Sequence, residues 1–260
     1  MTTQKIIHVL EEWAPPIYQE SYDNSGLLVG DSSKTVKAVL ICLDCTEEVV
    51  DEAIALGANM VIAHHPVIFS GLKKVTGTTY IERTVIKAIK HDIAIYALHT
   101  NLDNVMNGVN SKICDLLGIE NKRILQTKNG RSDVGSGMIG QLNKPMNTKV
   151  FLDQIKITFG ADCLRYTNVL KEEISKIAVC GGSGSFLLKD AIAQEADIFI
   201  TSDFKYHQFF DAENRIVIAD IGHYEAEKFT KELICDFLRE KFPTFALHLS
   251  KINTNPVNYL

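Results

Sequence analysis

Two adjacent histidines, His64 and His65, are the strongest chemical signal in the sequence, and Pro66 follows them directly. Consecutive side chains in an extended segment point to opposite sides, so the two imidazoles could serve two different metal ions. Pro66 disfavours helical backbone at His65 and therefore supports the extended geometry. The ordinary alternative is a pair of surface histidines in a loop, and the pair alone does not decide between the two.

A carboxylate follows a second apolar segment, at Asp103 in the sequence His99-Thr-Asn-Leu-Asp103. A carboxylate can bridge two cations through its two oxygens, which makes Asp103 a candidate metal ligand. Taken alone, Asp103 is explained more simply as a turn residue or as the cap of the helix that follows.

His223 and Glu227 form a third candidate group, in the sequence Gly222-His-Tyr-Glu-Ala-Glu227. Residues four apart on a helix project from one face, so this imidazole and this carboxylate could chelate one ion. The spacing is not H-E-x-x-H, so the chemistry of a zinc protease is not indicated. An ordinary polar pair within a helix is the alternative.

Together these groups supply three imidazoles and two carboxylates, which suits a two-metal site with coordination positions left for water and substrate. Such mixed ligands accept zinc, manganese, iron, cobalt or nickel and do not choose among them. His99 and His207 could support the ligands from behind, whereas the other three histidines fit structural or surface roles. The candidate metal ligands are His64, His65, Asp103, His223 and Glu227.

An alternating pattern of strands and helices must position these residues. It predicts an α/β fold of two lobes, residues 1–126 and 127–260, with largely parallel sheets and a last helix that can pack back on the first lobe. Ligands gather at the carboxyl ends of such strands. The predicted strands are 36–43, 60–63, 93–98, 137–142, 177–180, 198–200 and 216–219, and the predicted helices are 47–56, 80–90, 109–117, 148–158, 186–193 and 225–242.

Composition excludes several classes of protein. The chain has 260 residues, 46% of them hydrophobic, and a net charge of −5 without a basic block, so disorder and a nucleic-acid binder are disfavoured. Residues 1–13 predict an amphipathic helix rather than a signal peptide, and each apolar run is too short to span a membrane. Six sparse cysteines, Cys42 and Cys45 among them, indicate reduced thiols in a cytoplasmic protein.

Two glycine patterns look like nucleotide or nucleophile motifs without their required context. Gly135-Ser-Gly-Met-Ile-Gly140 spells a dinucleotide fingerprint but continues toward Pro145 instead of opening a helix, so we expect a strand there. Gly181-Gly-Ser-Gly-Ser185 lacks the last glycine of a nucleophile elbow. We expect it to be a turn before a helix, able to accept an anion.

The ordered set of motifs resembles the GTP cyclohydrolase 1 type 2 homologues, also called the Nif-three-like dinuclear-metal proteins. The resemblance covers essentially the whole chain. The residues that carry it are 22–30 (Tyr-Asp-Asn-Ser-Gly-Leu-Leu-Val-Gly), 63–66 (Ala-His-His-Pro), 99–103 (His-Thr-Asn-Leu-Asp), 180–184 (Cys-Gly-Gly-Ser-Gly), 201–207 (Thr-Ser-Asp-Phe-Lys-Tyr-His) and 222–227 (Gly-His-Tyr-Glu-Ala-Glu).

The resemblance implies metal ligands at the same five positions, with Asp103 bridging two divalent cations. It further implies that the two α/β lobes are similar, with the dinuclear metal site between them. It also implies a homohexameric ring with the metal sites facing an internal cavity. Two departures stand out: 260 residues leave no room for the extra domain that many members insert between the halves, and Ser202 stands where the family usually has glycine.

Two functions fit this resemblance. The first is a metal-dependent hydrolase acting on a nucleotide such as GTP or on a phosphoester, with Asp203, Lys205 and His207 as candidates for acid/base or phosphate contacts. The second is a ring-shaped scaffold that binds metal or a protein partner and turns over nothing. A site holding two dications would be locally positive and could receive an anionic nucleotide despite the acidic chain.

Overall fold

The computed structural model describes residues 1–128 and 130–260, which form two compact units. Unit 1 comprises residues 1–102 and 230–256, and unit 2 comprises residues 103–229 and 257–260. The units therefore divide at 102/103, 229/230 and 256/257. The sequence pattern instead suggested one junction near 126–134, a stretch whose residue 129 lies outside the described residues. Strand β5 accounts for the difference, because it pairs with β6 in the second sheet.

Unit 1 is built on a five-stranded sheet in the order β1-β4-β3-β2-β11. The last four strands in that order run parallel, and β1 is an antiparallel edge strand. The carboxyl ends of β4, β3, β2 and β11 therefore lie at one edge of the sheet. The elements of unit 1 are β1 (Gly26–Val29), β2 (Val39–Cys42), β3 (Met60–Ala63), β4 (Ala94–Ala97), β11 (Leu247–Leu249), α1 (Thr3–Trp13), η1 (Pro16–Tyr18), α2 (Glu47–Ala55), α3 (Tyr80–Lys90), α4 (Thr100–Asp103) and α9 (Thr230–Lys241).

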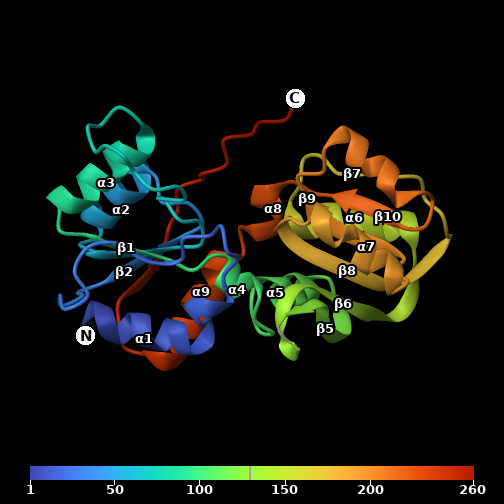
Figure 1. Cartoon of the computed structure of the whole chain (residues 1–260), viewed down its shortest axis with the longest axis horizontal. Coiled ribbons are helices and arrows are strands. Elements are labelled where there is room, and N and C mark those ends of the chain that lie inside the picture. Colours follow the sequence, from blue (N-terminus) through green and yellow to red (C-terminus); the bar gives the residue numbers. More distant parts are fainter. Residues whose placement is uncertain (129) are drawn as a thin grey trace. The chain divides into compact units, whose positions relative to one another are not determined.

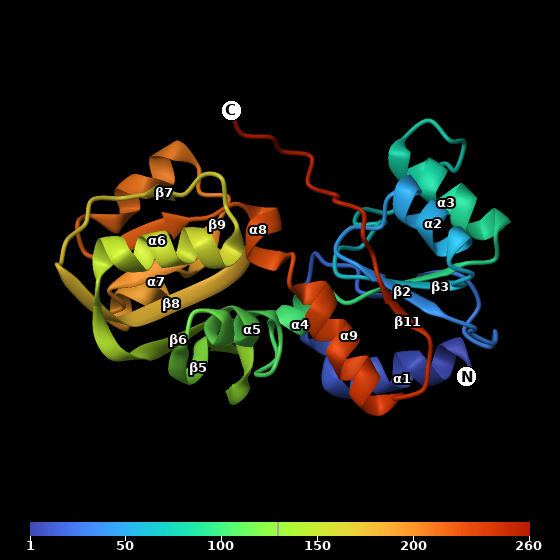
Figure 2. The ribbon, with the colours of Figure 1, turned by 180° about the vertical axis from the view of Figure 1, so that it is seen from behind.

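Helices cover both faces of this sheet (Figure 1). Alternate strand residues such as Leu40 and Val61 form one core cluster with Val49 of α2 and Val85 of α3. Helices α1 and α9 lie together on the opposite face (Figure 2), where the rings of Trp13 and Phe237 stack with centroids 4.1 Å apart. Burial on two faces explains why β2 and β3 are continuous apolar runs without polar alternation.

Unit 2 contains a mixed six-stranded sheet in the order β5-β6-β8-β9-β10-β7. Strands β8, β9 and β10 are parallel, and β5, β6 and β7 join antiparallel to their neighbours. The elements of unit 2 are β5 (Ile119–Lys128), β6 (Arg131–Asn147), β7 (Arg165–Tyr166), β8 (Glu173–Ser183), β9 (Ile198–Ser202), β10 (Val217–Asp220), α5 (Val109–Leu116), α6 (Thr148–Phe159), η2 (Ser185–Leu187), α7 (Leu188–Ala193), η3 (Tyr206–Ala212) and α8 (His223–Glu227).

The second sheet is also covered on both faces. Leu188 and Ala191 of α7 and Ala212 of η3 pack with strand residues such as Phe199 and Ile218 in one core cluster. Helix α6 lies across the other face of the sheet, as the two ribbon views show (Figures 1 and 2). The expected α/β class, with two lobes and largely parallel sheets, is confirmed.

Two local predictions can be compared with this structure. The single helix predicted over residues 225–242 is wrong: α8 ends at Glu227 and α9 begins at Thr230, and the break coincides with the passage of the chain from unit 2 to unit 1. The Gly135–Gly140 motif lies within β6, as expected.

All six cysteines are free thiols, and Cys163 alone among them is exposed.

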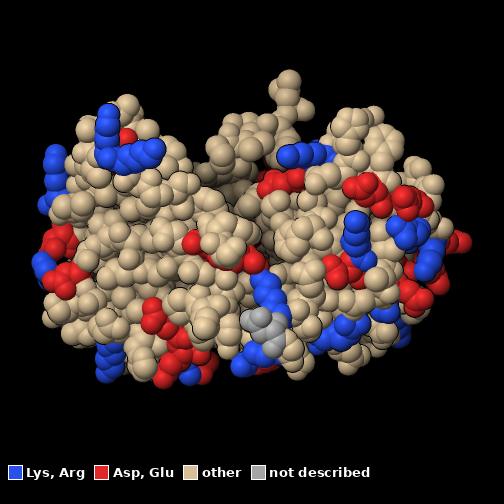
Figure 3. All heavy atoms as spheres, in the orientation of Figure 1, with Lys and Arg blue, Asp and Glu red and all other residues tan. Residues whose placement is uncertain are grey.

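On the face drawn in Figure 3, Lys and Arg side chains are interspersed with Asp and Glu side chains. Among the described residues, no helix combines the length and the apolar character that crossing a membrane requires.

The partly buried carboxylate of Asp197 should make a stabilising contact in unit 2. It accepts hydrogen bonds from the backbone amides of Ser175 and Lys176, both at 2.9 Å, and from Lys171 Nζ at 2.5 Å. Although burial raises it, these hydrogen bonds hold the pKa of Asp197 below its usual value of 3.8.

We expect Asp197→Ala to lower the free energy of unfolding by about 1–3 kcal/mol, because two partly buried amides and Lys171 lose a charged acceptor. A carboxyl with a lowered pKa stabilises the fold above its unfolded pKa, so this difference should shrink as pH falls below about 4. Urea unfolding at pH 7 and pH 3 measures both effects. Exposed Asp153→Ala is the control, and an equal loss in the two variants would contradict the prediction.

Candidate metal centre

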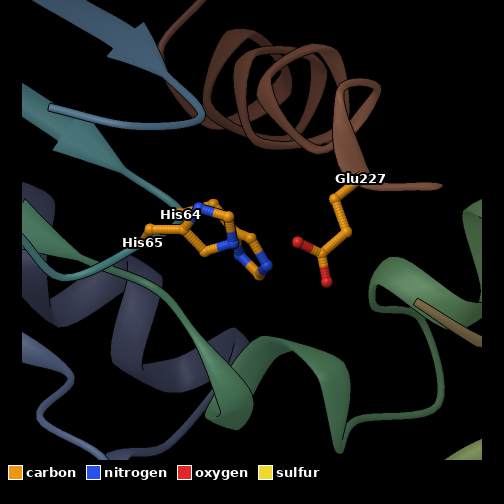
Figure 4. A group of neighbouring side chains, drawn as sticks. All are labelled: His64, His65 and Glu227. Carbon is orange, nitrogen blue, oxygen red and sulfur yellow. The ribbon is translucent and has the colours of Figure 1, made fainter. Parts of the chain in front are cut away.

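Unit 1 brings its chemistry-bearing side chains to the carboxyl ends of three neighbouring parallel strands. His64 and His65 follow β3, Asp44 follows β2 and His99 follows β4. The backbone ladder continues beyond the strands, because His65 N donates to Leu43 O at 2.9 Å. The sheet therefore fixes the backbone of the histidine pair, whose side chains leave the end of β3 in Figure 4.

His64 is buried, and its ring is held by the backbone of the next strand. Its Nδ1 donates to the carbonyl oxygen of Leu98 at 2.7 Å. A carbonyl oxygen can only accept, so Nδ1 carries the proton and the neutral ring has its lone pair on Nε2. This tautomer is the one that metal-binding histidines adopt when a neighbouring oxygen fixes the other nitrogen.

The ring of His65 is held in the same way by a carboxylate. Its Nδ1 donates to Asp44 Oδ1 at 2.7 Å, and Thr254 Oγ1 donates to Asp44 Oδ2 at 2.5 Å. Although burial raises it, the hydrogen bonds from His65 and Thr254 hold the pKa of Asp44 below its usual value. Asp44 is therefore an ionised acceptor, and His65 presents Nε2.

His99 completes a cluster of three imidazoles in unit 1. Its ring meets the rings of His64 and His65 edge-on, with centroids 5.4 and 5.5 Å away. Its Nδ1 lies 2.6 Å from Oδ1 of Asp23, whose buried carboxylate also accepts from the Thr100 amide at 3.0 Å and from the Thr100 hydroxyl. His99 is thus a rigid neighbour of the histidine pair, in keeping with the supporting role expected for it.

In unit 2, His223 and Glu227 lie one turn apart on α8, as the i, i+4 spacing predicted. His223 Nε2 is 3.0 Å from Oε2 of buried Glu227, and attraction to this carboxylate raises the pKa of His223 to about 11. Two donor atoms about 3 Å apart match neighbouring ligands around an ion with bonds of about 2.1 Å. Figure 4 shows the Glu227 side chain extending from α8.

Asp203, predicted as an acid/base candidate, instead holds the ring of His223. Its Oδ2 lies 2.7 Å from His223 Nδ1, a hydrogen bond that lowers the pKa of Asp203. Its backbone has a φ of 61°, an uncommon conformation for a residue other than glycine. Ser202, at the position where the resemblance leads one to expect glycine, donates its hydroxyl to Gly222 O at 2.8 Å and so fastens the start of α8.

The glycine-rich turn after β8 provides space for Glu227. A Cβ on Gly182 would overlap with Oε1 of Glu227 and would lie 3.2 Å from Cε1 of His223. A 3-10 turn (η2) and the six-residue helix α7 follow, so the expected turn before a helix is present. The glycines are explained by the close approach of α8.

Asp103 is tied to the same turn. Asn110 donates to the carbonyl oxygen of Asp103 at 3.0 Å and accepts from the amide of Gly181 at 2.9 Å. Asp103 ends α4, and Gly108 rather than Asp103 is the N-cap of α5, so the alternative of a helix cap does not apply. Unit 2 thus connects Asp103 to the turn that accommodates Glu227.

Lys205 and His207 lie apart from these contacts, on the exposed face of unit 2. The ring of His207 stacks on that of Phe210, with centroids 6.3 Å apart. Beside them, Tyr206, Phe209 and Phe210 line a groove of about 590 Å³ that also includes Arg165. Of the three acid/base candidates, Asp203 therefore orients the ring of His223, whereas Lys205 and His207 lie on an exposed surface that carries aromatic side chains.

The structure also assigns roles to residues that the sequence analysis did not propose as ligands or as supports for ligands, although Asp23 lies within the motif 22–30. Asp44 and Asp23 hold histidine rings through their carboxylates, and Thr254 holds Asp44. Asp44 could have been found, because it follows an apolar strand as the histidines do. Asp23 and Thr254 come from irregular segments, where local sequence gives no periodic signal.

The chain is similar to known proteins over most of its length. The chain matches the family described as Duf34/NIF3 (NGG1p interacting factor 3) over residues 1–256. It is 39% identical over 228 residues to the GTP cyclohydrolase 1 type 2 homolog of Clostridium perfringens, covering 87% of each chain. It is 34% identical to the protein of that name from Streptococcus pneumoniae over the full length of both. The crystal structure of Staphylococcus aureus hypothetical protein SA1388 is 30% identical, with a TM-score of 0.93 over 100% of this chain and 99% of that one.

The packing of Glu227 on Gly182 can be tested by adding one methyl group. Gly118 is the matched control, since it has a similar φ of 68° but open space around its Cβ position. We expect Gly118→Ala to cost about 1 kcal/mol of stability from backbone strain, and Gly182→Ala about 1–3 kcal/mol more from overpacking. Urea unfolding measures both costs.

The extra cost should disappear in a Glu227→Ala background, because the overlapping carboxylate is then absent. Equal costs for the two glycines, or an extra cost that persists without Glu227, would contradict the assigned role of Gly182.

Proposed function

This chain belongs to the Duf34/NIF3 family, and from that premise we propose that it binds two divalent metal ions and hydrolyses a nucleotide or another phosphoester. The observation that carries the proposal is that the rings of His64, His65 and His223 are all oriented by a hydrogen bond at Nδ1. Each has Nδ1 bonded to an oxygen, at Leu98, Asp44 and Asp203, so that Nε2 is the nitrogen that we propose binds metal. For His223, metal would replace the proton in the contact of Nε2 with Glu227 Oε2, 3.0 Å away. The proposed ligands are His64, His65, Asp103, His223 and Glu227.

The proposal joins two sets of donors that are each organised within their own unit. Unit 1 supplies the two imidazoles at the end of β3, and unit 2 supplies the His223–Glu227 pair together with Asp103. Five protein ligands are fewer than two ions require, so coordination positions stay open for water and substrate. We propose Asp103 as the bridging carboxylate, which follows from the family resemblance and from its two-oxygen chemistry.

The residues present fit divalent ions of the zinc, manganese, iron, cobalt or nickel type, because imidazole and carboxylate donors suit all of them. When bound, such ions make a coordinated water more acidic and polarise a substrate oxygen. The protein's own part is to orient the ligands: Asp44 and the Leu98 carbonyl orient His65 and His64, and Asp203 orients His223.

A nucleotide substrate is supported by the surface beside Asp203 and by the names of the relatives. Tyr206 and Phe210 expose aromatic faces on which a base can stack, and Lys205 offers a cation for phosphate. The relatives from Clostridium perfringens and Streptococcus pneumoniae are named GTP cyclohydrolase 1 type 2 homolog. We therefore propose GTP as the first nucleotide to test.

Assembly and location complete the proposal. The family resemblance supports a homohexameric ring. The cytoplasm is supported by the six free cysteines, five of which are buried thiols without reason to oxidise.

Metal binding should require both units. After removal of metal with a chelator, we expect the wild-type chain to take up about two equivalents of zinc or manganese, measured by elemental analysis and calorimetry. The pair His64→Ala/His65→Ala and the pair His223→Ala/Glu227→Gln should each lose at least one equivalent and weaken the remaining affinity by more than about tenfold. His8→Ala/His91→Ala is the control for removing two histidines.

Two sites that act independently would give a different result, since each double variant would then retain the full affinity of the other half. Thermal melting with and without chelator separates the roles further. A preformed site should lose only a few degrees on chelation, whereas a structural site should unfold.

Turnover tests the hydrolase part separately. We expect purified protein loaded with metal to hydrolyse GTP or a chromogenic phosphoester, and activity to fall by more than about 100-fold in His64→Ala/His65→Ala. Full activity in that variant would sink the hydrolase proposal. No turnover of nucleotides and phosphoesters by fully loaded protein would instead favour the non-catalytic scaffold.

A further inference from the structure

The segment that follows β11 extends the arrangement of strand ends in unit 1. In the order β4-β3-β2-β11 the four strands are parallel, and the residues after the first three provide His99, the histidine pair and Asp44. The chain after β11, residues 250–255, therefore leaves the sheet at the same carboxyl edge. We call these residues the C-terminal strap.

The C-terminal strap is anchored before it reaches Asp44. Ser250 Oγ donates to Glu52 Oε2 at 2.5 Å, and the Lys251 amide donates to Glu52 Oε1 at 2.9 Å. The Ser250 amide continues the sheet ladder by donating to Ile41 O at 2.8 Å. Ile252 packs against the core cluster of unit 1. These contacts fix the backbone path, so the position of Thr254 is set by the fold.

Thr254 ends this path on the carboxylate that holds His65. Its hydroxyl donates to Asp44 Oδ2 at 2.5 Å, while His65 Nδ1 donates to Asp44 Oδ1 at 2.7 Å. Each oxygen of Asp44 thus has one partner. A carboxylate that is hydrogen-bonded at one oxygen alone can still rotate. When Thr254 holds Oδ2, Oδ1 stays in one orientation and the His65 ring has one direction in which to donate.

We propose that Thr254 is a positioning residue for the metal centre: by holding Asp44, it fixes the tautomer and the direction of the His65 ring. The inference rests on the proposed function, since it concerns how a proposed ligand is presented. It gives the C-terminal strap a role in orienting His65, a role that the sequence motifs around the histidines do not predict. Outer partners of metal-binding histidines commonly contribute tenfold or more to metal affinity, and Thr254 acts one bond further away.

The matched variants are Thr254→Val, which keeps the shape and removes the hydroxyl, and Thr254→Ser, which keeps the hydroxyl. In metal-free protein, nitrogen NMR of the His65 ring reports its tautomer, with His65→Gln used to assign the signal. We expect a single Nδ1-protonated form in wild type and Thr254→Ser and a mixture in Thr254→Val. Zinc affinity by competition with a chromogenic chelator should fall about fivefold in Thr254→Val and recover in Thr254→Ser.

The two readouts separate the inference from the proposed function. Unchanged tautomer and unchanged zinc affinity in Thr254→Val would overturn the role of Thr254 while leaving the metal centre intact. Failure of the wild type to bind metal would count against the proposed function, and the tautomer measurement would still decide the positioning. Thermal melting checks that the variants fold. If Thr254→Val is unstable, Thr254→Ala serves in the same comparison, because Thr254 lies in a partly exposed irregular segment.

Discussion

The hydrogen bond at Nδ1 is the interaction on which the candidate centre depends. Imidazole has two nitrogens, and a ring that is free to choose its tautomer presents a lone pair only part of the time. In this protein the Nδ1 partners are a strand carbonyl for His64 and carboxylates for His65 and His223. These partners come from strands next to those that carry the histidines, so sheet pairing itself sets the chemistry of the rings.

This dependence explains why parallel strands occur where they do. Strands β2, β3 and β4 deliver Asp44, the histidine pair and His99 to one edge, and strands β9 and β10 deliver Asp203 and His223 to another. An antiparallel neighbour would carry each supporting oxygen to the opposite end of the sheet. The antiparallel strands β1, β5, β6 and β7 lie at or toward the outer side of their sheets, and none of them separates the strands named above from one another.

Local patterns in the sequence predicted most of the regular elements and the placement of His223 and Glu227 one helical turn apart, because apolar runs and the i, i+4 spacing depend on neighbouring residues only. The prediction worked for the strand before His64 and for the helical pair His223 and Glu227. It did not find Asp23 or Thr254, which act through contacts 76 and 210 residues away along the chain. It also joined α8 and α9 into one helix, since the helical pattern continues through the residues where the chain changes units. Such contacts are set by the tertiary fold, and single-sequence periodicity carries no information about them.

The discontinuity of unit 1 has a consequence for the order of events during synthesis. Residues 103–229 of unit 2 form one nearly continuous stretch, which can fold as soon as it leaves the ribosome. Unit 1 must wait for α9 and β11, and Asp44 acquires its second partner only when Thr254 has been made. A nascent chain can therefore display the histidine pair well before the ring of His65 is locked. The His65 site is therefore finished only after residues 250–255 have been made, of which Thr254 lies 210 residues after Asp44.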